Sequence, residues 1–568
     1  MTDIKTATAE AIADAAKAKY GCELTAEDAK AMLEYPPDPK MGDLALPCFK
    51  LSKILHAAPP KIAADIAEAL SCPVISSATV LGGYLNFTVS PDYYSKTVLD
   101  EIIEKGDDYG KSDEGKGKTV VLDYSSPNVA KPFHIGHLGT TVIGHSLKML
   151  HEYLGYTCVG VNHLGDWGTQ FGKLIVAFRN WGSEEAVEKN GIDELVDLYV
   201  KFHEEAEKDP TLEDKARDEF TKLEHGDPEN RRLWKWFIDL SIVEYKKTYR
   251  QLGIEFDSYM GESFYYDKAA PVVAELKEKE LLKIDDGASI VPLDDYGMPP
   301  CLILKKDGST IYAVRDIAAA MYRKETYDFA KCIYVTSSAQ SLHFAQFFKV
   351  ISLMGHDWAK NLVHVPYGTV SINGSKLATR TGNVILLRDL FATAIDKVKE
   401  IMDEKSPDLE NKDETAEAVG VGAIVFHYLS NSRIKDINFV MEDALNFDGN
   451  TGPYCQYTYA RCSSILNKAG EYADYKGEYQ PNETELALLK ALSLFPEKVR
   501  DAAKDYEPMI ITRYILDIAG AFNRFYHECQ IISADGDARS FRLRLTKAAK
   551  TVLGCAFGLI CMKKTEKI

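Results

Sequence analysis

The stretch Ser125-Ser-Pro-Asn-Val-Ala-Lys-Pro-Phe-His-Ile-Gly-His-Leu-Gly139 decides the fold of this chain. The run KTVVLDY at 118–124 precedes it, and its β-branched residues predict a buried parallel strand. The run TTVIGHSLKML at 140–150 follows it and predicts a helix with an apolar face. Where a strand leads through a tight turn into a helix, free backbone N–H groups and the helix dipole meet at one point. The stretch therefore predicts a phosphate-binding site in an α/β fold.

Two histidines in this stretch are the candidate phosphate ligands. His134 and His137 are three residues apart at the start of the predicted helix, so both can face the same site. Gly136 between them has no side chain and lets a ligand approach the backbone. The plain alternative is a pair of surface or core histidines near a turn. The position between a strand and a helix favours the binding site over this alternative.

The motif His134-Ile-Gly-His137 resembles the HIGH signature of class I aminoacyl-tRNA synthetases, and the string 125–137 resembles the arginyl-tRNA synthetase family. The strings NHLGDWGTQFG at 162–172 and DGSTIYAVRD at 307–316 resemble the same family, and the resemblance runs nearly end to end. It implies an arginine–tRNA ligase, which activates L-arginine with ATP to arginyl-adenylate. The arginine is then transferred to the 3′ end of tRNA-Arg, and AMP and pyrophosphate are released.

The resemblance also implies the domain organisation. We expect an α/β fold class, with a Rossmann-type nucleotide-binding catalytic domain at 111–410 and an insertion at about 175–300. We expect an N-terminal α+β domain that contacts the tRNA elbow at 1–110, and an α-helical anticodon-binding domain at 411–568. Within these domains the patterns predict, among other elements, a strand over 80–89 and a helix over 483–503.

The bulk composition describes a globular protein of 568 residues, enough for roughly two to four domains. No apolar run reaches the roughly 18 residues of a membrane span. The eleven cysteines include no Cys-x-x-Cys pair, which predicts reduced thiols in a cytoplasmic protein and argues against a zinc knuckle. The net charge of −18 weakens a generic nucleic-acid-binding interpretation and leaves room for a local basic surface.

The chemistry that the resemblance implies needs donors placed around phosphates. Adenylate formation is an in-line attack of a carboxylate on the α-phosphate, and negative charge builds on the phosphate oxygens. The resemblance assigns catalysis to His134, His137, Lys131 and Lys376. It assigns ATP binding to His134, Gly136, His137 and Lys376. ATP would bring Mg²⁺ as its counter-ion, and no protein-bound metal is expected.

A second phosphate element is expected in SINGSKLATRTGN at 371–383, which is similar to the KMSKS loop of the family. Lys376 stands at the first lysine of that pattern, and Thr379 replaces the second. The resemblance implies that Lys131, just before the HIGH-like motif, substitutes for the missing lysine. Lysine suits this work because it is a mobile point charge on a flexible stem. The plain alternative for Lys376 is a solvated loop lysine.

Recognition of arginine needs a carboxylate, because a planar guanidinium pairs with it through two parallel hydrogen bonds. The resemblance places Asp316 in this role with Tyr312 beside it. It also gives Asp123 as a second acid, where the family usually has glutamate. An alternative role for Asp316 is to cap a helix that begins at Ile317. The residues that resemble the family's holders of the amino-acid α-groups are Ser126, Asn128 and Gln340.

Contacts with tRNA are predicted in both terminal domains. The candidates are Asn86 and Phe87 near the N-terminus, and Tyr459 and Arg461 in the helical part. Aromatic rings can stack on unpaired bases, and a basic side chain can pair with phosphate. The alternative in each case is that the aromatic ring belongs to the core.

Two further positions depart from the family pattern: Gly139 stands where arginine is frequent, and the chain ends at Ile568 where methionine is usual. Two other classes of function stay open. One is an HxGH nucleotidyltransferase that acts on a small carboxylate without RNA, which the large insertion and the helical C-terminal part argue against. The other is a non-catalytic synthetase-like binding protein, which the presence of the catalytic residues argues against. The resemblance implies a monomer that activates arginine only when tRNA is bound.

Overall fold

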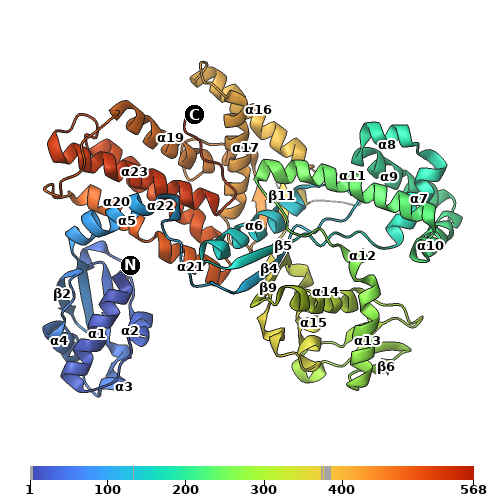
Figure 1. Cartoon of the computed structure of the whole chain (residues 1–568), viewed down its shortest axis with the longest axis horizontal. Coiled ribbons are helices and arrows are strands. Elements are labelled where there is room, and N and C mark those ends of the chain that lie inside the picture. The colour runs from blue at the N-terminus through green and yellow to red at the C-terminus, as the bar shows by residue number, and fades with distance from the viewer. Residues whose placement is uncertain (1–3, 132, 373–374, 377–384) are drawn as a thin grey trace. The chain divides into compact units, whose positions relative to one another are not determined.

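The computed structural model describes residues 4–131, 133–372, 375–376 and 385–568 (Figure 1). They form two compact units. The first comprises Met1–Gly106, Ala469–Ser493 and Arg524–Ala548, and the second comprises Asp107–Lys468, Leu494–Asn523 and Ala549–Ile568. Within this described part of the chain, no helix has both the length and the apolar character that crossing a lipid bilayer requires.

The first unit contains a small antiparallel sheet with the strand order β1-β3-β2. A buried cluster that includes Ile12, Ile62 and Leu85 joins this sheet to the helices around it. The strands are β1 (Leu44–Pro47), β2 (Ile75–Leu81) and β3 (Tyr84–Val89). The helices before Gly106 are α1 (Ile4–Tyr20), α2 (Ala26–Met32), α3 (Ser52–Leu55), α4 (Pro59–Ala69) and α5 (Leu99–Lys105).

The prediction of a single strand over 80–89 is wrong, because this segment contains the turn of a hairpin. Leu81 pairs with Tyr84 across two glycines, and Gly82 has a φ of +61°. Glycine adopts positive φ without steric cost, so a Gly-Gly pair can reverse the chain within two residues. The alternating apolar pattern was real, but it belongs to two strands.

The second unit contains a four-stranded parallel sheet with the order β10-β9-β4-β5, as a Rossmann-type fold requires. Its strands are β4 (Thr119–Asp123), β5 (Thr157–Val161), β9 (Lys331–Ser337) and β10 (Leu362–Tyr367). Helix α6 (Leu138–Tyr153) covers one face, and helices α14 (Tyr312–Tyr327) and α15 (Ser341–Leu353) lie on the other (Figure 1). The predicted fold class is confirmed.

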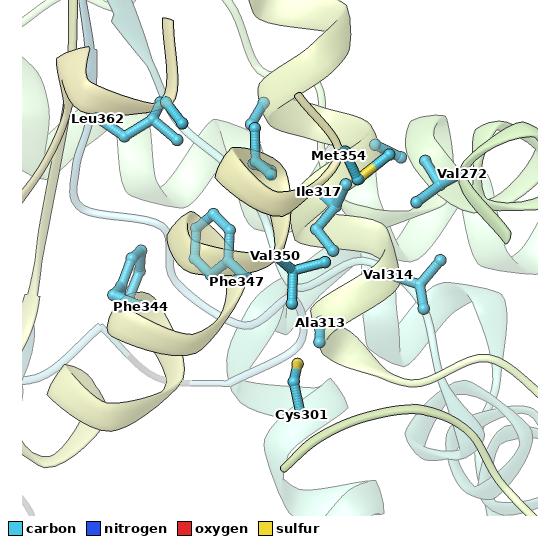
Figure 2. Packing of buried hydrophobic residues seen from close by; sticks show 14 of the residues in the cluster. Val272, Cys301, Ala313, Val314, Ile317, Phe344, Phe347, Val350, Met354 and Leu362 are labelled. Atoms are coloured by element: carbon cyan, nitrogen blue, oxygen red, sulfur yellow. The ribbon is translucent and has the colours of Figure 1, made fainter. Parts of the chain in front are cut away.

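A large apolar cluster joins this sheet to α14 and α15. Val121 of β4 and Cys332 of β9 contribute to it from the sheet. Figure 2 shows part of the cluster, with Val314 and Ile317 of α14 near Val350 of α15. Because these side chains are fully buried, the two helices are held firmly against each other.

The segment between β5 and α14 inserts helices and a second small sheet into the nucleotide fold. Its strands follow the antiparallel order β6-β7-β8, with β6 (Lys283–Asp285), β7 (Ala288–Val291) and β8 (Cys301–Leu304). Its helices are α7 (Thr169–Trp181), α8 (Glu184–Asn190), α9 (Ile192–Lys208), α10 (Thr211–Glu224), α11 (Pro228–Leu252), α12 (Glu262–Tyr265) and α13 (Ala269–Glu278).

Helices dominate the chain after β10, apart from a short sheet of β11 (Val370–Ile372), β12 (Ser375–Lys376) and β13 (Ile437–Phe439). The predicted single helix over 483–503 is wrong, because α20 ends at Ser493 and α21 begins at Phe495. Pro496 lies in the first turn of α21, where its missing N–H costs nothing, but it could not continue the preceding helix. The helices are α16 (Leu387–Lys405), α17 (Lys412–Leu429), α18 (Met441–Ala444), α19 (Gly452–Ala469), α20 (Glu483–Ser493), α21 (Phe495–Asp505), α22 (Met509–Glu528) and α23 (Gly536–Gly558).

Candidate active site

The loop that joins β4 to α6 begins with two residues in the left-handed region. Ser125 has a φ of 69° and Ser126 a φ of 46°, values that L-residues rarely adopt. Hydrogen bonds hold this turn: the Ser125 N–H donates to Thr140 Oγ1 at 3.0 Å, and the Ser126 N–H donates to Asn162 Oδ1 at 3.1 Å. The turn therefore lies at the carboxyl ends of the parallel strands, where such sheets bind their ligands.

His134 and His137 cap the start of the helix together. The Gly136 N–H donates to Nδ1 of His134 at 3.0 Å, and the His134 N–H donates to Nδ1 of His137 at 3.2 Å. The centres of the two rings are 4.1 Å apart. Since each Nδ1 accepts a hydrogen bond, the hydrogen of each neutral ring is on Nε2. The pair thus offers two Nε2–H donors.

The surroundings keep both histidines neutral. Burial lowers the pKa of His137 to about 3, and the nearby His134 and the positive charge of Lys131 act in the same direction. Burial also lowers the pKa of His134, with Lys131 as the second cause. At neutral pH the motif therefore provides hydrogen-bond donors without positive charge. The exposed side chain of Lys131 provides the cation beside them.

The chain that follows the second predicted phosphate element is bonded to the histidine turn through its backbone. The Ile135 N–H donates to the carbonyl of Ile385 at 3.1 Å, and the Leu387 N–H donates to that of Phe133 at 2.9 Å. On the other side of the segment 377–384, the backbone of Lys376 lies in β12, which pairs with β11. The side chain of Lys376 lies outside the described part of the chain, and so does Thr379.

Asp123 ends β4, and a cation of the same chain already neutralises it. Arg323 Nη2 lies 2.8 Å from Asp123 Oδ2, and the Ser126 hydroxyl donates to Oδ1 at 2.9 Å. The Arg323 side chain is 1% exposed, so its charge has little water to balance it and depends on Asp123. Asn128, further along the turn, is exposed. A Cβ on Gly165 would lie 2.1 Å from Asn128 Oδ1, so a larger residue there would require the Asn128 side chain to move.

Asp316 lies in the second turn of α14. The helix begins at Tyr312 with Ile311 at the N-cap position, so Asp316 does not cap it. Its Oδ2 lies 2.6 Å from Nε2 of His343, a residue of α15. Tyr312 is 64% exposed, and Gln340, after β9, is also exposed. These two side chains are thus free to meet a ligand from solvent.

Reasoning from the sequence missed Glu262, the first residue of α12. Its Oε2 lies 3.5 Å from Arg315 Nη2 and has no hydrogen-bond partner among the described residues. Burial raises the pKa of Glu262 to about 7, while Arg315 lowers it and Asp316 raises it. A buried carboxylate near a second one suits a bound cation. In the sequence, Glu262 stands in the string Gly261-Glu262-Ser263, which resembles no motif. Its relevance becomes visible only when the fold brings it near Asp316.

The glycine at position 139 has a structural reason. A Cβ there would lie 2.1 Å from the hydroxyl oxygen of Tyr428, a buried residue of α17. The arginine that is frequent at this position in the similar family could therefore not fit at position 139 unless Tyr428 moved.

Three of the side chains predicted to contact RNA are buried. Asn86 is 6% exposed, Phe87 is 0% exposed and Tyr459 is 4% exposed. The structure does not support contacts by these three side chains, because each is covered by the rest of the protein. Arg461 is half-buried and donates to Asn523 Oδ1.

Exposed aromatic rings lie near the same sequence positions. In the first unit, Phe49 is 54% exposed, Tyr84 is 43% exposed, and their ring centres are 5.5 Å apart. In the second unit, Tyr457 is 43% exposed and lies 4.9 Å from the guanidinium carbon of Arg461. These rings could stack on bases without any change in the core.

Three protein-family models match the chain. The model of the catalytic domain of class I tRNA synthetases (R) matches residues 98–441. The model of the arginyl tRNA synthetase N-terminal domain matches residues 2–89, and that of the DALR anticodon binding domain matches residues 455–568.

Curated relatives and solved structures are similar over nearly the whole length. The arginine–tRNA ligase of Alkaliphilus metalliredigens is 51% identical over 540 residues, which cover 94% of this chain and 95% of that protein. The arginine–tRNA ligase of Clostridium beijerinckii is 49% identical with full coverage of both chains. The structure of Thermus thermophilus arginyl-tRNA synthetase superposes with a TM-score of 0.85 at 25% identity, and each chain is fully covered.

Proposed function

This chain belongs to the arginyl-tRNA synthetases of class I and is an arginine–tRNA ligase, and we propose which of its side chains carry the reaction. The enzyme activates L-arginine with ATP to arginyl-adenylate and transfers the arginine to the 3′ end of tRNA-Arg. The observation that carries the assignment of residues is the contrast between two parts of the site. Neutral donors and a lysine surround the helix start, and carboxylates lie near α14 and α12.

The two histidines are proposed to stabilise the triphosphate during adenylate formation. The α-carboxylate of arginine attacks the α-phosphate, pyrophosphate leaves, and no covalent bond to the enzyme forms. Nε2–H groups of His134 and His137 would donate to the phosphate oxygens as negative charge builds on them. Gly136 has no side chain, which leaves room for the nucleotide. Neutral donors suit this step because they need no proton uptake or release.

Lys131 and Lys376 are proposed to supply the positive charge. Lys131 is exposed three residues before His134, and the backbone of Lys376 lies in β12. ATP is proposed to arrive as its Mg²⁺ complex, with the ion held by phosphate oxygens. This arrangement requires no metal site built from protein side chains.

Asp316 and Glu262 are proposed to bind the guanidinium group of arginine. Asp123 contributes in a different way, because Arg323 already balances its charge and it holds Ser126 in place. Tyr312 is proposed to lie beside the guanidinium. The residues proposed to hold the α-amino and α-carboxylate groups are Ser126, Asn128 and Gln340.

The RNA contacts are proposed to use exposed aromatic rings in place of buried ones. Phe49 and Tyr84 would contact the tRNA elbow, and Tyr457 with Arg461 would contact the anticodon loop. Replacing Tyr84 with alanine should raise the KM for tRNA and leave the KM values for arginine and ATP unchanged. We further propose domains at 1–110, 111–410 and 411–568, and a monomer that works in the cytoplasm.

One experiment separates this function from its alternatives. The protein is incubated with ATP and each amino acid in turn, with and without bulk tRNA, and both AMP release and charged tRNA are measured. An arginine–tRNA ligase charges tRNA with arginine alone. A nucleotidyltransferase would consume ATP without RNA, and a binding protein would give no turnover with any amino acid.

A further inference from the structure

We propose that His343 is a positioning residue for arginine recognition. Its imidazole orients the carboxylate of Asp316, so that the free oxygen of Asp316 faces the guanidinium group. The inference rests on the proposed role of Asp316 in binding arginine. It assigns to His343 an effect on arginine affinity that acts only through Asp316.

The geometry of the pair carries the inference. His343 Nε2 and Asp316 Oδ2 are 2.6 Å apart, a distance typical of a strong hydrogen bond to a charged acceptor. The side chains of His343 and Asp316 are 31% and 29% exposed, so the pair is open to solvent on one side. Among the described residues, no other group donates a hydrogen bond to Asp316. Its Oδ1 is therefore left for a ligand.

Core packing fixes the imidazole in this place. Phe344 and Phe347, on the same helix as His343, are anchored in the cluster that also contains Ile317, the neighbour of Asp316 (Figure 2). The His343 ring lies 5.5 Å from the ring of Phe344 and 5.4 Å from that of Phe347. Because α14 and α15 cannot slide past each other, the hydrogen bond constrains the rotamer of Asp316.

Charge explains why an imidazole suits this position. A neutral imidazole donates one hydrogen bond and leaves the negative charge of Asp316 for the guanidinium. Asp123 shows the opposite case, since its charge is taken by Arg323 at 2.8 Å. The cation beside Asp316 in the sequence, Arg315, lies 3.5 Å from Glu262. In the part of the chain that the structure describes, Asp316 pairs only with a histidine, and it is thus the acid best able to bind a cationic substrate.

The test is steady-state aminoacylation at saturating ATP and tRNA-Arg with five variants. His343→Leu removes the donor, and His343→Gln keeps an N–H at a similar distance. Asp316→Asn and the double variant Asp316→Asn/His343→Leu complete a double-mutant cycle. The matched control is His356→Leu, because His356 also faces a carboxylate, Glu275, at 3.2 Å.

We expect His343→Leu to raise the KM for arginine about tenfold, as fits losing one hydrogen bond to a charged group, with little change in kcat or in the KM for ATP. His343→Gln should recover most of this loss, and His356→Leu should show none. In the Asp316→Asn background, His343→Leu should add nothing. If His343→Leu had the same effect in the wild-type and Asp316→Asn backgrounds, or raised the KM values for both arginine and ATP, the inference about His343 would be wrong. The proposed role of Asp316 would not be affected. If Asp316→Asn left the KM for arginine unchanged, the role of Asp316 and the inference would both fall.

Discussion

The backbone N–H of His134 donates to Nδ1 of His137 at 3.2 Å, and this bond decides which nitrogen of His137 can act on a substrate. With Nδ1 occupied as an acceptor, the neutral ring carries its hydrogen on Nε2. The same holds for His134, whose Nδ1 accepts from Gly136 at 3.0 Å. The motif thus builds two donors of defined direction from a single turn of backbone.

The first prediction concerns these donors. Replacing His134 or His137 with alanine should cut aminoacylation by about 10² or more, the scale for losing a donor that stabilises transition-state charge. His137→Gln should retain more activity than His137→Ala, because its amide can replace the Nε2–H. The midpoint of thermal unfolding serves as the control for folding. Near-normal turnover of both alanine variants would refute the phosphate-site assignment.

Much of the fold could be predicted because local pattern and tertiary packing agree there. The predicted strand at 118–124 and helix at 140–150 correspond to β4 and α6, which pack on each other in the core. The errors at 80–89 and 483–503 arose at Gly82 and Pro496, two turn-forming residues inside otherwise continuous apolar patterns. At these two positions the turn-forming residue, and not the apolar periodicity, determined where the strand or helix ends.

The candidate site could be predicted only where its residues are contiguous. His134, Gly136 and His137 form one turn, so their spacing alone indicates that they converge. The pairing of Arg323 with Asp123, and the approach of Glu262 to Asp316, depend on how distant segments pack. The sequence also could not predict which side chains are exposed, because an alternating strand pattern does not say which of the two faces packs against the core.

The second prediction concerns the charge of Asp316. Asp316→Asn should raise the KM for arginine by about 10²-fold, because the bound guanidinium would lose its charged hydrogen-bond acceptor. The KM for ATP should change little. Asp328→Asn is the matched control, since Asp328 lies at the other end of α14 and is exposed. If ATP affinity fell and arginine affinity did not, Asp316 would be a nucleotide contact.

The third prediction concerns pH. Burial raises the pKa of Glu262 to about 7, so this carboxyl loses its negative charge as the pH falls below 7. Only the charged form attracts a guanidinium. The KM for arginine should therefore rise about tenfold between pH 8 and pH 6, one pKa unit on either side. Glu262→Gln should remove this dependence, and an unchanged slope in that variant would exclude Glu262 as its source.

The fourth prediction is that Lys131 takes the role of the second lysine of the KMSKS pattern, which Thr379 replaces in this chain. Lys131→Ala should slow adenylate formation, because Thr379 carries no charge to stabilise the phosphates. Adding Thr379→Lys should recover part of the loss if both positions serve the same phosphates. Single-turnover formation of arginyl-adenylate with tRNA present measures both effects. Unchanged turnover of Lys131→Ala would contradict the assignment.

The last prediction concerns dependence on RNA. Induced fit would let tRNA binding energy assemble the site, so that ATP is not consumed without an acceptor. The chain has parts for such coupling, because the backbone at Ile385 and Leu387 bonds to the histidine turn, and helix α16 begins at Leu387. Arginine-dependent ATP–pyrophosphate exchange should be very slow alone, rise strongly with tRNA-Arg, and weaken with salt because the RNA contacts are ionic. A tRNA for another amino acid is the control. Full exchange without tRNA, unchanged on adding it, would refute the coupling.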